Sequence, residues 1–330
     1  MGRSSLVGTL VAGRYRLTEL IRRGITGDTY LATHPVLGVR FAVKMLGDAL
    51  SDDLAAKKRI KHEAEVVSRL DHPNIVAMHD FGETPEGRFY LVMEHIQGHS
   101  LRREIRKMDP DLPTLRRSLI LLKQVCNALT TAHDVGVIHR GIRPANIYLT
   151  RSRSGEERVK LLDFGLSKVI RDDEASNLTR NRPILGDPRY MAPEHLTGAP
   201  VDPRVDIFSV GVVAYKLLTG DLPFGGRKPI QIIAAHQSGP APDLSDMRPA
   251  DLTKVPSNLE RILMRCLAID REDRPRHVAD LVEAILMTLP RVPEERNEGK
   301  RHTITRVSGS ADEALAWARN ATADFHSASS

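Results

Sequence analysis

Three polar residues of this chain have the chemistry to hold a phosphate group and a metal ion. Lys44 ends a run of strand-forming residues, and a lysine is a flexible point charge that suits phosphate oxygens. Asp163 lies seventeen residues after Asn146, behind a short apolar run, and each of the two residues offers an oxygen ligand. Oxygen ligands suit a hard cation such as Mg²⁺, which keeps several waters and bridges phosphates. Taken alone, Lys44 could equally be a surface lysine at a strand end, so its context decides.

A small β-sheet is predicted around Lys44. Strand-forming runs broken by Gly and Pro cover residues 15–21, 28–34, 39–46 and 88–96. One helix is expected within this part, over residues 52–70, because apolar residues recur there with a helical period. Its apolar face comprises Ile60, Ala64, Val67 and Leu70.

The apolar period becomes helical after residue 97. Helices are predicted at 101–108, around 119–129, at 206–220 and at 277–289. The run 206–220 is apolar on nearly every side, which at this length indicates a buried central helix and not a membrane span.

The stretch 137–150, VIHRGIRPANIYLT, resembles the catalytic loop of a protein kinase. In that family His-Arg-Asp is followed by four residues and then Asn. Here His139, Arg140 and Asn146 are in place, but Gly141 stands where the Asp is expected. The resemblance implies that Asn146 binds magnesium and that the general base, which accepts the proton of the substrate hydroxyl, is missing.

The resemblance extends over roughly residues 15–289 and assigns further roles. The run Phe41-Ala42-Val43-Lys44 resembles the strand that carries the ATP-orienting lysine, with Ala42 near the adenine. Glu63 falls where the family's helix glutamate would pair with Lys44, and we interpret the rival Glu65 as an exposed charge. Asp163-Phe164-Gly165 is the expected second magnesium site.

The nucleotide side of the resemblance contains departures from the family. Gly24 and Gly27 match the second and third glycines of the loop that covers the ATP phosphates, but Arg22 replaces the first. Thr29 stands where the family usually has Val above the adenine. Both changes put close contact with a nucleotide in doubt.

The run 88–96 resembles the fifth strand and the hinge of a kinase. Met93 would lie at the back of the nucleotide pocket, and backbone groups near Glu94 and Ile96 would face the adenine edge. Tyr148 stands where the family has a small aliphatic residue beneath the adenine, although some active members carry an aromatic residue there.

Other matches imply structural roles. In the family, Asp206 would anchor the catalytic-loop backbone that includes His139 and Arg140, and Glu194 of an Ala-Pro-Glu motif would pair with Arg274. Thr179 and Ser176 are candidate phosphorylation sites that Arg140 could recognise. The alternative is that they are two hydroxyl groups of a polar loop.

Asp187 is a further departure, because active Ser/Thr kinases usually have Thr there. Our hypothesis is that Asp187 pairs with Arg143 and fills the space that the catalytic Asp would occupy. A bolder alternative makes Asp187 a substitute base. That role requires it to come within about 2.6–3.2 Å of the proton that it takes, directly or through a water.

Composition narrows the class of protein. The 330 residues are 41% hydrophobic and 27% charged, which is ordinary for a globular protein, and the net charge is +6. No run of about eighteen or more apolar residues occurs, so no transmembrane segment is expected. Cys126 and Cys266 are interpreted as buried thiols in a reducing compartment. We expect a cytoplasmic protein whose partner or substrate is a protein and not a nucleic acid.

The expected fold is α+β and bilobal: a small lobe with an antiparallel sheet and one main helix, and a larger, mostly helical lobe. The expected segments are an N-terminal tail (1–14), the first lobe and hinge (15–96), the second lobe (97–289) and a C-terminal tail (290–330). The C-terminal tail is expected to be partly disordered, and a short helix could form around Trp317.

Three functions fit this resemblance. The favoured one is a pseudokinase that binds Mg-ATP weakly and acts as a regulatory or scaffolding module. The second is a slow but active Ser/Thr kinase that transfers the γ-phosphate of ATP to protein hydroxyls, because general-base catalysis contributes only about 10²–10⁴-fold. The third is an interaction module that uses no nucleotide, which Arg22, Thr29 and Tyr148 would favour.

Overall fold

The computed structural model describes residues 6–24, 26–47, 54–107, 113–152, 154–164, 186–244 and 255–292. The described chain forms two compact units. Unit 1 contains its residues up to Lys57 and Ala77–Gln97, and unit 2 contains Lys58–Val76 and its residues from Gly98 to Val292. The expected lobe boundary after residue 96 stays a prediction. Residues 58–76 were expected in the first lobe, and the structure assigns them to unit 2.

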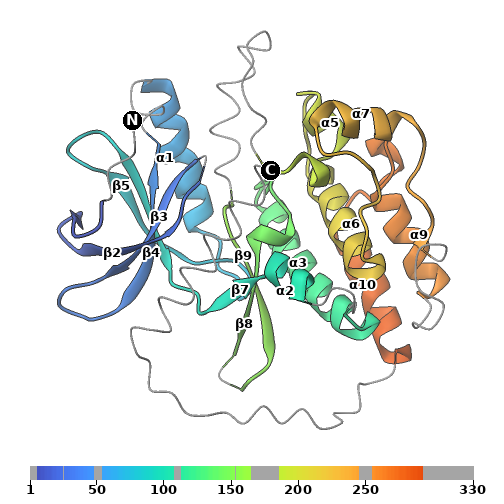
Figure 1. The fold of residues 1–330 in the computed structure, drawn as a ribbon, viewed down its shortest axis with the longest axis horizontal. Helices are drawn as coiled ribbons and strands as arrows, with labels where there is room; N and C mark the ends of the chain where they lie inside the picture. Colours follow the sequence, from blue (N-terminus) through green and yellow to red (C-terminus); the bar gives the residue numbers. More distant parts are fainter. Residues whose placement is uncertain are drawn as a thin grey trace. The chain divides into compact units, whose positions relative to one another are not determined.

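Unit 1 is built on a six-stranded antiparallel sheet in the order β1-β2-β3-β4-β6-β5 (Figure 1). Its strands are β1 (Leu10–Val11), β2 (Tyr15–Arg22), β3 (Gly27–Thr33), β4 (Arg40–Leu46), β5 (Met78–Glu83) and β6 (Phe89–Glu94). Buried and more exposed residues alternate at the start of β2, as expected when one face of a strand meets a core. That core includes Leu17, Tyr30, Val43 and Val92.

The N-terminal residues depart from the expected polar tail. Within the described part of that tail, β1 pairs with β2, and Val11 is buried in the core of the sheet. Ala12 and Gly13 both adopt positive φ angles, which makes the tight hairpin turn between the two strands. A strand of two residues is too short to give a recognisable alternation in the sequence, so pattern alone did not reveal it.

Unit 2 combines a small sheet with most of the helices. The sheet contains β7 (Gly98–Ser100), β8 (Ile147–Arg151) and β9 (Glu157–Leu161). The α-helices that lie within it are α2 (Leu101–Lys107), α3 (Leu115–Asp134), α5 (Pro193–Leu196), α6 (Arg204–Thr219), α7 (Pro229–Gln237), α9 (Ser257–Cys266) and α10 (Ala279–Thr288). Helix α1 (Leu54–Ser68) starts in unit 1 and continues into unit 2. Two short 3₁₀ helices bear on the site, η2 (Pro144–Asn146) and η4 (Pro188–Tyr190).

Helix α6 is the centre of unit 2, as predicted for the run 206–220. Its residues from Val205 to Thr219 are buried except Lys216, and the helix packs against α3 and α9. Gly211 permits the close approach to α9, because a Cβ atom there would lie 2.9 Å from Cβ of Cys266. None of the helices in the described ranges is long and apolar enough to cross a membrane.

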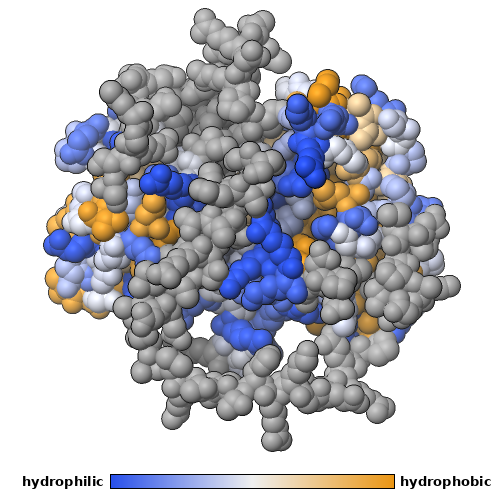
Figure 2. Space-filling model, viewed as in Figure 1, coloured by the Kyte–Doolittle hydropathy of each residue, from blue (hydrophilic) through white to orange (hydrophobic). Residues whose placement is uncertain are grey.

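Apolar residues on the surface are scattered. On the face drawn in Figure 2, hydrophilic side chains cover much of the coloured surface and apolar ones appear in separate groups. Val36 and Leu37, in the turn between β3 and β4, are the most exposed large apolar residues of unit 1 among those described. Scattered apolar residues of this kind are normal on protein surfaces and do not by themselves identify a binding site.

Candidate functional site

The loop that carries Gly141 is anchored on Asp206 of α6. The Asp206 carboxylate accepts hydrogen bonds from the backbone N–H groups of His139 and Arg140, each at 2.8 Å. Nε2 of His133 lies 2.9 Å from Oδ2 of the same carboxylate. Burial alone would raise the pKa of Asp206, but the hydrogen bond and charge of His133 outweigh it, so the pKa lies below its usual value. A buried carboxylate with this set of donors fixes the backbone of the loop at His139 and Arg140.

Two non-glycine residues of the site have left-handed backbone conformations. Arg140 has φ = +58° and Asp163 has φ = +62°. Such angles cost free energy in residues with a Cβ atom, and they persist only where surrounding contacts impose them. The hydrogen bond from the Arg140 N–H to Asp206 is one such contact.

Gly141 occupies a position that does not require glycine. A Cβ atom built there would lie 3.6 Å from Nδ2 of Asn146 and 3.6 Å from Nδ1 of His139, which are ordinary van der Waals distances. Its φ angle is also outside the left-handed region that favours glycine. The backbone at this position can therefore accept a residue with a Cβ atom.

Asn146 presents an oxygen that suits a metal ion. Its Nδ2 donates to the backbone oxygen of Gly141 at 2.9 Å, which fixes the orientation of the amide. Its Oδ1 is buried and accepts no hydrogen bond from the residues that the structure describes. Burying an acceptor without a donor is costly, and a cation at this oxygen would remove the cost. The side chain thus fits the magnesium role that the family resemblance implies.

Asp163 and Phe164 follow β9 and lie beside the catalytic-loop histidine. The rings of His139 and Phe164 are 4.4 Å apart, and both side chains are buried. Burial lowers the pKa of His139, while the charges of Asp206 and Asp163 oppose that shift. The backbone N–H of Leu162 donates to the backbone oxygen of Asn146 at 3.0 Å, which ties the segment before Asp163 to η2. Unit 2 thus brings both predicted metal ligands to one loop cluster.

Asp187 has a partner that the sequence did not indicate, Arg189. Its two carboxylate oxygens accept hydrogen bonds from Nε and Nη2 of Arg189, at 2.8 and 2.6 Å. Burial would raise the pKa of Asp187, but the hydrogen bonds and charge of Arg189 lower it, and the charge of Arg143 lowers it further. Asp187 thus has a two-point partner in Arg189, and its hypothesised pairing with Arg143 stays a prediction.

The predicted phosphate-binding residues belong to unit 1. Lys44 in β4 is buried and lies opposite Thr29 of β3 and Leu91 of β6. A Cβ atom at Gly27 would lie 2.1 Å from the backbone oxygen of Met45, and one at Gly24 would lie 2.7 Å from the oxygen of Gly27. Both positions therefore require glycine, because the chain's own backbone passes too close for a Cβ atom.

The predicted adenine-side residues divide between the two units. Ala42 lies opposite Met93, near the end of β6. Glu94 is bound to Ala77, the residue before β5. Its backbone N–H donates to the backbone oxygen of Ala77, and its Oε1 accepts from the Ala77 N–H. Ile96 follows in the connection and is half-buried.

Tyr148 and Glu63 belong to unit 2. Tyr148 is half-buried in β8, opposite Ser100 of β7. Glu63 lies in the part of α1 that belongs to unit 2, whereas Lys44 lies in unit 1. The pairing of Glu63 with Lys44 therefore stays a prediction.

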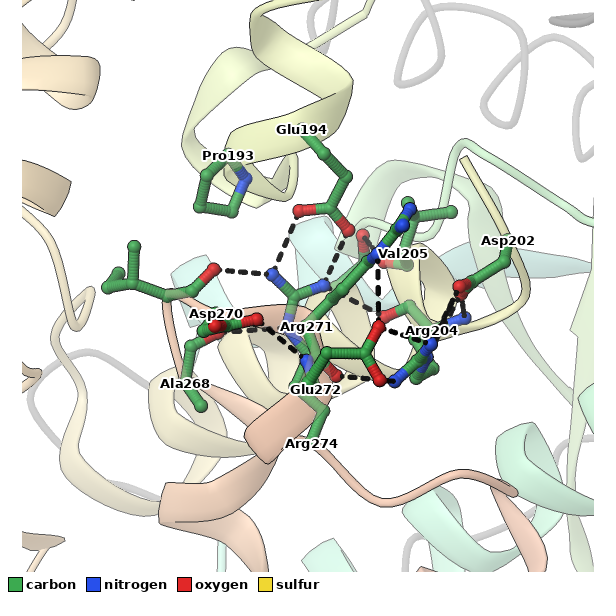
Figure 3. Close-up of polar contacts among 12 residues, drawn as sticks. Pro193, Glu194, Asp202, Arg204, Val205, Ala268, Asp270, Arg271, Glu272 and Arg274 are labelled. Atoms are coloured by element: carbon green, nitrogen blue, oxygen red, sulfur yellow. Dashed lines mark hydrogen bonds and ion pairs between the residues drawn. The ribbon is translucent and has the colours of Figure 1, made fainter. Parts of the chain in front are cut away.

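Glu194 and Arg274 form the ion pair that the resemblance implied (Figure 3). The two guanidinium nitrogens lie 2.6 and 2.9 Å from the Glu194 oxygens. Arg274 is buried, donates to the backbone oxygen of Ala268 as well, and lies over the ring of Phe208. Arg204 carries a neighbouring surface network, with its guanidinium between Asp202 and Glu272.

Sequence reasoning missed two residues of the site, His133 and Arg189. His133 lies in the last turn of α3, one short loop before His139, and Arg189 lies two residues after Asp187. Their closeness in sequence to His139 and to Asp187 was the signal that could have identified them. Gly165, the candidate phosphorylation sites Ser176 and Thr179, and Trp317 lie outside the described residues.

Comparisons with known proteins agree on one family. Residues 15–285 match the protein kinase domain. The chain is 36% identical over 273 residues to the serine/threonine-protein kinase pkn2 of Myxococcus xanthus, covering 83% of this chain and 32% of pkn2. It is 38% identical over 244 residues to PknJ of Mycobacterium tuberculosis, covering 73% of this chain and 40% of PknJ. The chain thus spans well under half of the length of these curated relatives.

The structural comparison leads to the same family. The crystal structure of the Mycobacterium tuberculosis PknI kinase domain superimposes with a TM-score of 0.66 and 29% identity, over 86% of this chain and 99% of that one. The expected fold class, with an antiparallel-sheet lobe and a mainly helical lobe, is thereby confirmed. The chain belongs to the protein kinase family, and its relatives are bacterial serine/threonine-protein kinases.

Proposed function

We propose that this kinase domain is a pseudokinase, which binds Mg-ATP weakly and acts as a regulatory or scaffolding module for a protein partner. The observation that carries the proposal is Gly141, which stands where the family has its proton-accepting Asp. Asp187 is a poor replacement, because both of its oxygens are bound by Arg189 and its pKa is lowered. A carboxylate in this state has little tendency to take a proton from a hydroxyl group.

Nucleotide binding is expected to survive. Lys44 would hold phosphate oxygens, and Asn146 Oδ1 and Asp163 would hold the metal. A bound Mg²⁺ would supply positive charge that neutralises the phosphate groups. The buried Oδ1 of Asn146 supports this part of the proposal, since it has no donor among the described residues. Arg22 and Thr29 in the first unit are the residues expected to weaken the binding.

A slow but active Ser/Thr kinase is the second candidate. Its support is the family itself, in which pkn2 and PknJ are named kinases, together with the fit of Asn146 to a metal. Phosphoryl transfer depends mostly on positioning and on charge stabilisation, which Lys44, Asn146 and Asp163 would still provide.

Two measurements separate the candidates. Thermal unfolding with and without ATP and Mg²⁺ tests nucleotide use, because a ligand selective for the native state must raise the melting temperature. No stabilisation at millimolar ATP would leave only an interaction module that uses no nucleotide. Transfer of radiolabelled phosphate to a generic protein substrate, compared with an Asp163→Ala variant, tests catalysis. Strong labelling by the parent chain that Asp163→Ala abolishes would overturn the pseudokinase proposal.

A further inference from the structure

The turn between β2 and β3 is closed by its own hydrogen bonds. The backbone N–H of Gly27 donates to the backbone oxygen of Gly24 at 3.2 Å, and the backbone N–H of Gly24 donates to Oδ1 of Asp28 at 3.4 Å. We call residues 22–24 and 26–28 the glycine turn. Its two glycines therefore direct their N–H groups at acceptors of the turn itself.

The glycine turn also lies against the backbone that follows it in the sheet of unit 1. The backbone oxygen of Thr26 accepts from the N–H of Gly47, the residue after β4, at 3.3 Å. A Cβ atom at Gly27 would collide with the backbone oxygen of Met45 in β4. Contacts with the end of β4 and the hydrogen bond to Asp28 thus hold the turn in one conformation.

Asp28 is the side chain that completes this conformation. It is 7% exposed, and Asp28 and Asp206 are the two buried acidic residues in the part of the chain that the structure describes. Asp206 binds backbone N–H groups of the catalytic loop, and Asp28 binds a backbone N–H group of the glycine turn. Burying a carboxylate is costly unless it accepts hydrogen bonds, so the Asp28 carboxylate and the Gly24 N–H hold each other in place.

The closed glycine turn bears on phosphate binding. Loops that bind phosphate do so by donating backbone N–H groups to the phosphate oxygens. An N–H group has one hydrogen to donate, and the Gly27 N–H already donates to Gly24, which Asp28 in turn holds. A phosphate that receives the Gly27 N–H must therefore replace this hydrogen bond, which costs part of the binding free energy.

We propose that Asp28 is a positioning residue that makes the nucleotide site discriminate against phosphate groups. It holds Gly24, and through Gly24 the N–H of Gly27, in the closed glycine turn. Removal of the Asp28 carboxylate releases the turn and raises the affinity for nucleotides that carry phosphate. Adenosine, which has no phosphate group, gains nothing from the release. The inference rests on the proposed function, because it assigns a residue that weakens Mg-ATP binding.

The test is the set of dissociation constants for adenosine, ADP and ATP, measured by calorimetric titration of the full chain in the presence of Mg²⁺. Asp28→Ala is expected to tighten ADP and ATP binding about tenfold, because a charge-assisted hydrogen bond no longer competes with the phosphate. The dissociation constant of adenosine is expected to stay the same. An unchanged or weaker affinity for ATP would overturn the proposal, and so would an equal gain for adenosine and ATP.

Two further variants of Asp28 separate its hydrogen bond from its charge. Asp28→Asn keeps an acceptor oxygen for the Gly24 N–H but carries no charge, so it is expected to gain less ATP affinity than Asp28→Ala. Equal gains in these two variants would show that the charge acts alone and would overturn the positioning role. Asp28→Val has no acceptor and suits a strand, so it should match Asp28→Ala and carries the same test if the alanine variant does not fold.

Glu86→Ala is the matched control. It removes the same charge at an exposed site of unit 1, in the turn between β5 and β6. The ratio of the adenosine and ATP dissociation constants is expected to stay that of the parent chain. A gain in ATP affinity equal to that of Asp28→Ala would show an effect of net charge and would overturn the proposal.

Failure of this inference is distinguishable from failure of the proposed function. The titration reports no phosphoryl transfer, so its result for Asp28→Ala is independent of whether the parent chain is an active kinase. Unchanged ATP affinity in Asp28→Ala, with no transfer by the parent chain, would remove the positioning role alone. Strong transfer by the parent chain, with the expected gain in Asp28→Ala, would remove the pseudokinase proposal alone. Absence of binding of all three ligands to every variant would overturn both.

Discussion

Arg189 binds Asp187 through two parallel hydrogen bonds, from Nε to Oδ1 at 2.8 Å and from Nη2 to Oδ2 at 2.6 Å. The pair occupies the residues that precede the Ala-Pro-Glu segment. Because both carboxylate oxygens are engaged, Asp187 is held as a charged acceptor of hydrogen bonds. The pair thereby ties the residue before η4 to the side chain of Arg189 within η4.

A double-mutant cycle tests this pair. Asp187→Asn and Arg189→Gln, alone and together, are expected to show a coupling of about 1 kcal/mol in the free energy of unfolding, since Arg189 is partly exposed and solvent screens the attraction. The coupling should be present near neutral pH and fade in acid. Asp187 has a lowered pKa in the native state, so its contribution is lost as the pH falls through that value. Additive effects of the two substitutions at neutral pH would contradict the pair.

Gly141→Asp should increase phosphoryl transfer. A Cβ atom at this position makes only ordinary contacts, so the variant is expected to fold, and a restored general base is worth about 10²–10⁴-fold. Radiolabel transfer to a generic substrate measures the gain. Gly141→Asn is the matched control, because it adds a side chain of the same shape without the basic carboxylate. Equal gains in both variants would mean that the side chain acts by filling space.

Breaking the buried Glu194–Arg274 pair should destabilise unit 2 strongly. Glu194→Gln is expected to cost about 3–5 kcal/mol in the free energy of unfolding, because it leaves the buried guanidinium of Arg274 without its counter-charge. Denaturant unfolding measures the change. Glu272→Gln is the control, since Glu272 is largely exposed in its pair with Arg204 and its loss should change the stability little. A cost for Glu194→Gln as small as that of the control would contradict the assigned role.

His236 should make the protein less stable in mild acid. It lies edge-on to Phe208 and Phe224, and burial, with a contribution from the charge of Arg274, lowers its pKa to about 4. The unfolded chain therefore takes up a proton near pH 6.5, before the native chain does, and native stability falls as the pH drops from there towards 4.

Melting temperatures at neutral pH and near pH 5 check this. His236→Gln should reduce the acid-induced decrease in melting temperature, although His72, His95 and His139, whose pKa values are also lowered, will keep part of it. His277→Gln, at an exposed histidine, should leave the decrease unchanged. An unchanged decrease in the His236 variant would remove this histidine as the cause.

The order of the motifs and the apolar periods made much of the fold predictable. The remaining elements became visible only in the folded structure. The strands could be recognised because burial of one face imposes a period of two residues. The helix at 206–220 could be recognised because a helix that is buried on all sides is apolar on all sides. The two-residue strand β1 and the assignment of residues 58–76 to unit 2 leave no such pattern, because they depend on contacts made after the chain has folded.

Within the site, position could be inferred but pairing could not. The spacing of Asn146 and Asp163 from Gly141 indicated where each would fall, and unit 2 places them around one loop. Arg143 was the hypothesised partner of Asp187, and nothing in the sequence indicated the hydrogen bonds from Arg189, two residues away. A local arginine can reach a carboxylate without bringing two segments together, which makes the nearer pair entropically favourable.

The unstrained backbone at Gly141 has an evolutionary consequence. Where glycine is imposed by conformation or crowding, as at Gly27, replacement by a larger residue disrupts the fold. Gly141 has neither constraint, so a residue with a Cβ atom fits the backbone there. A substitution at this position therefore meets natural selection without a prior penalty in backbone strain.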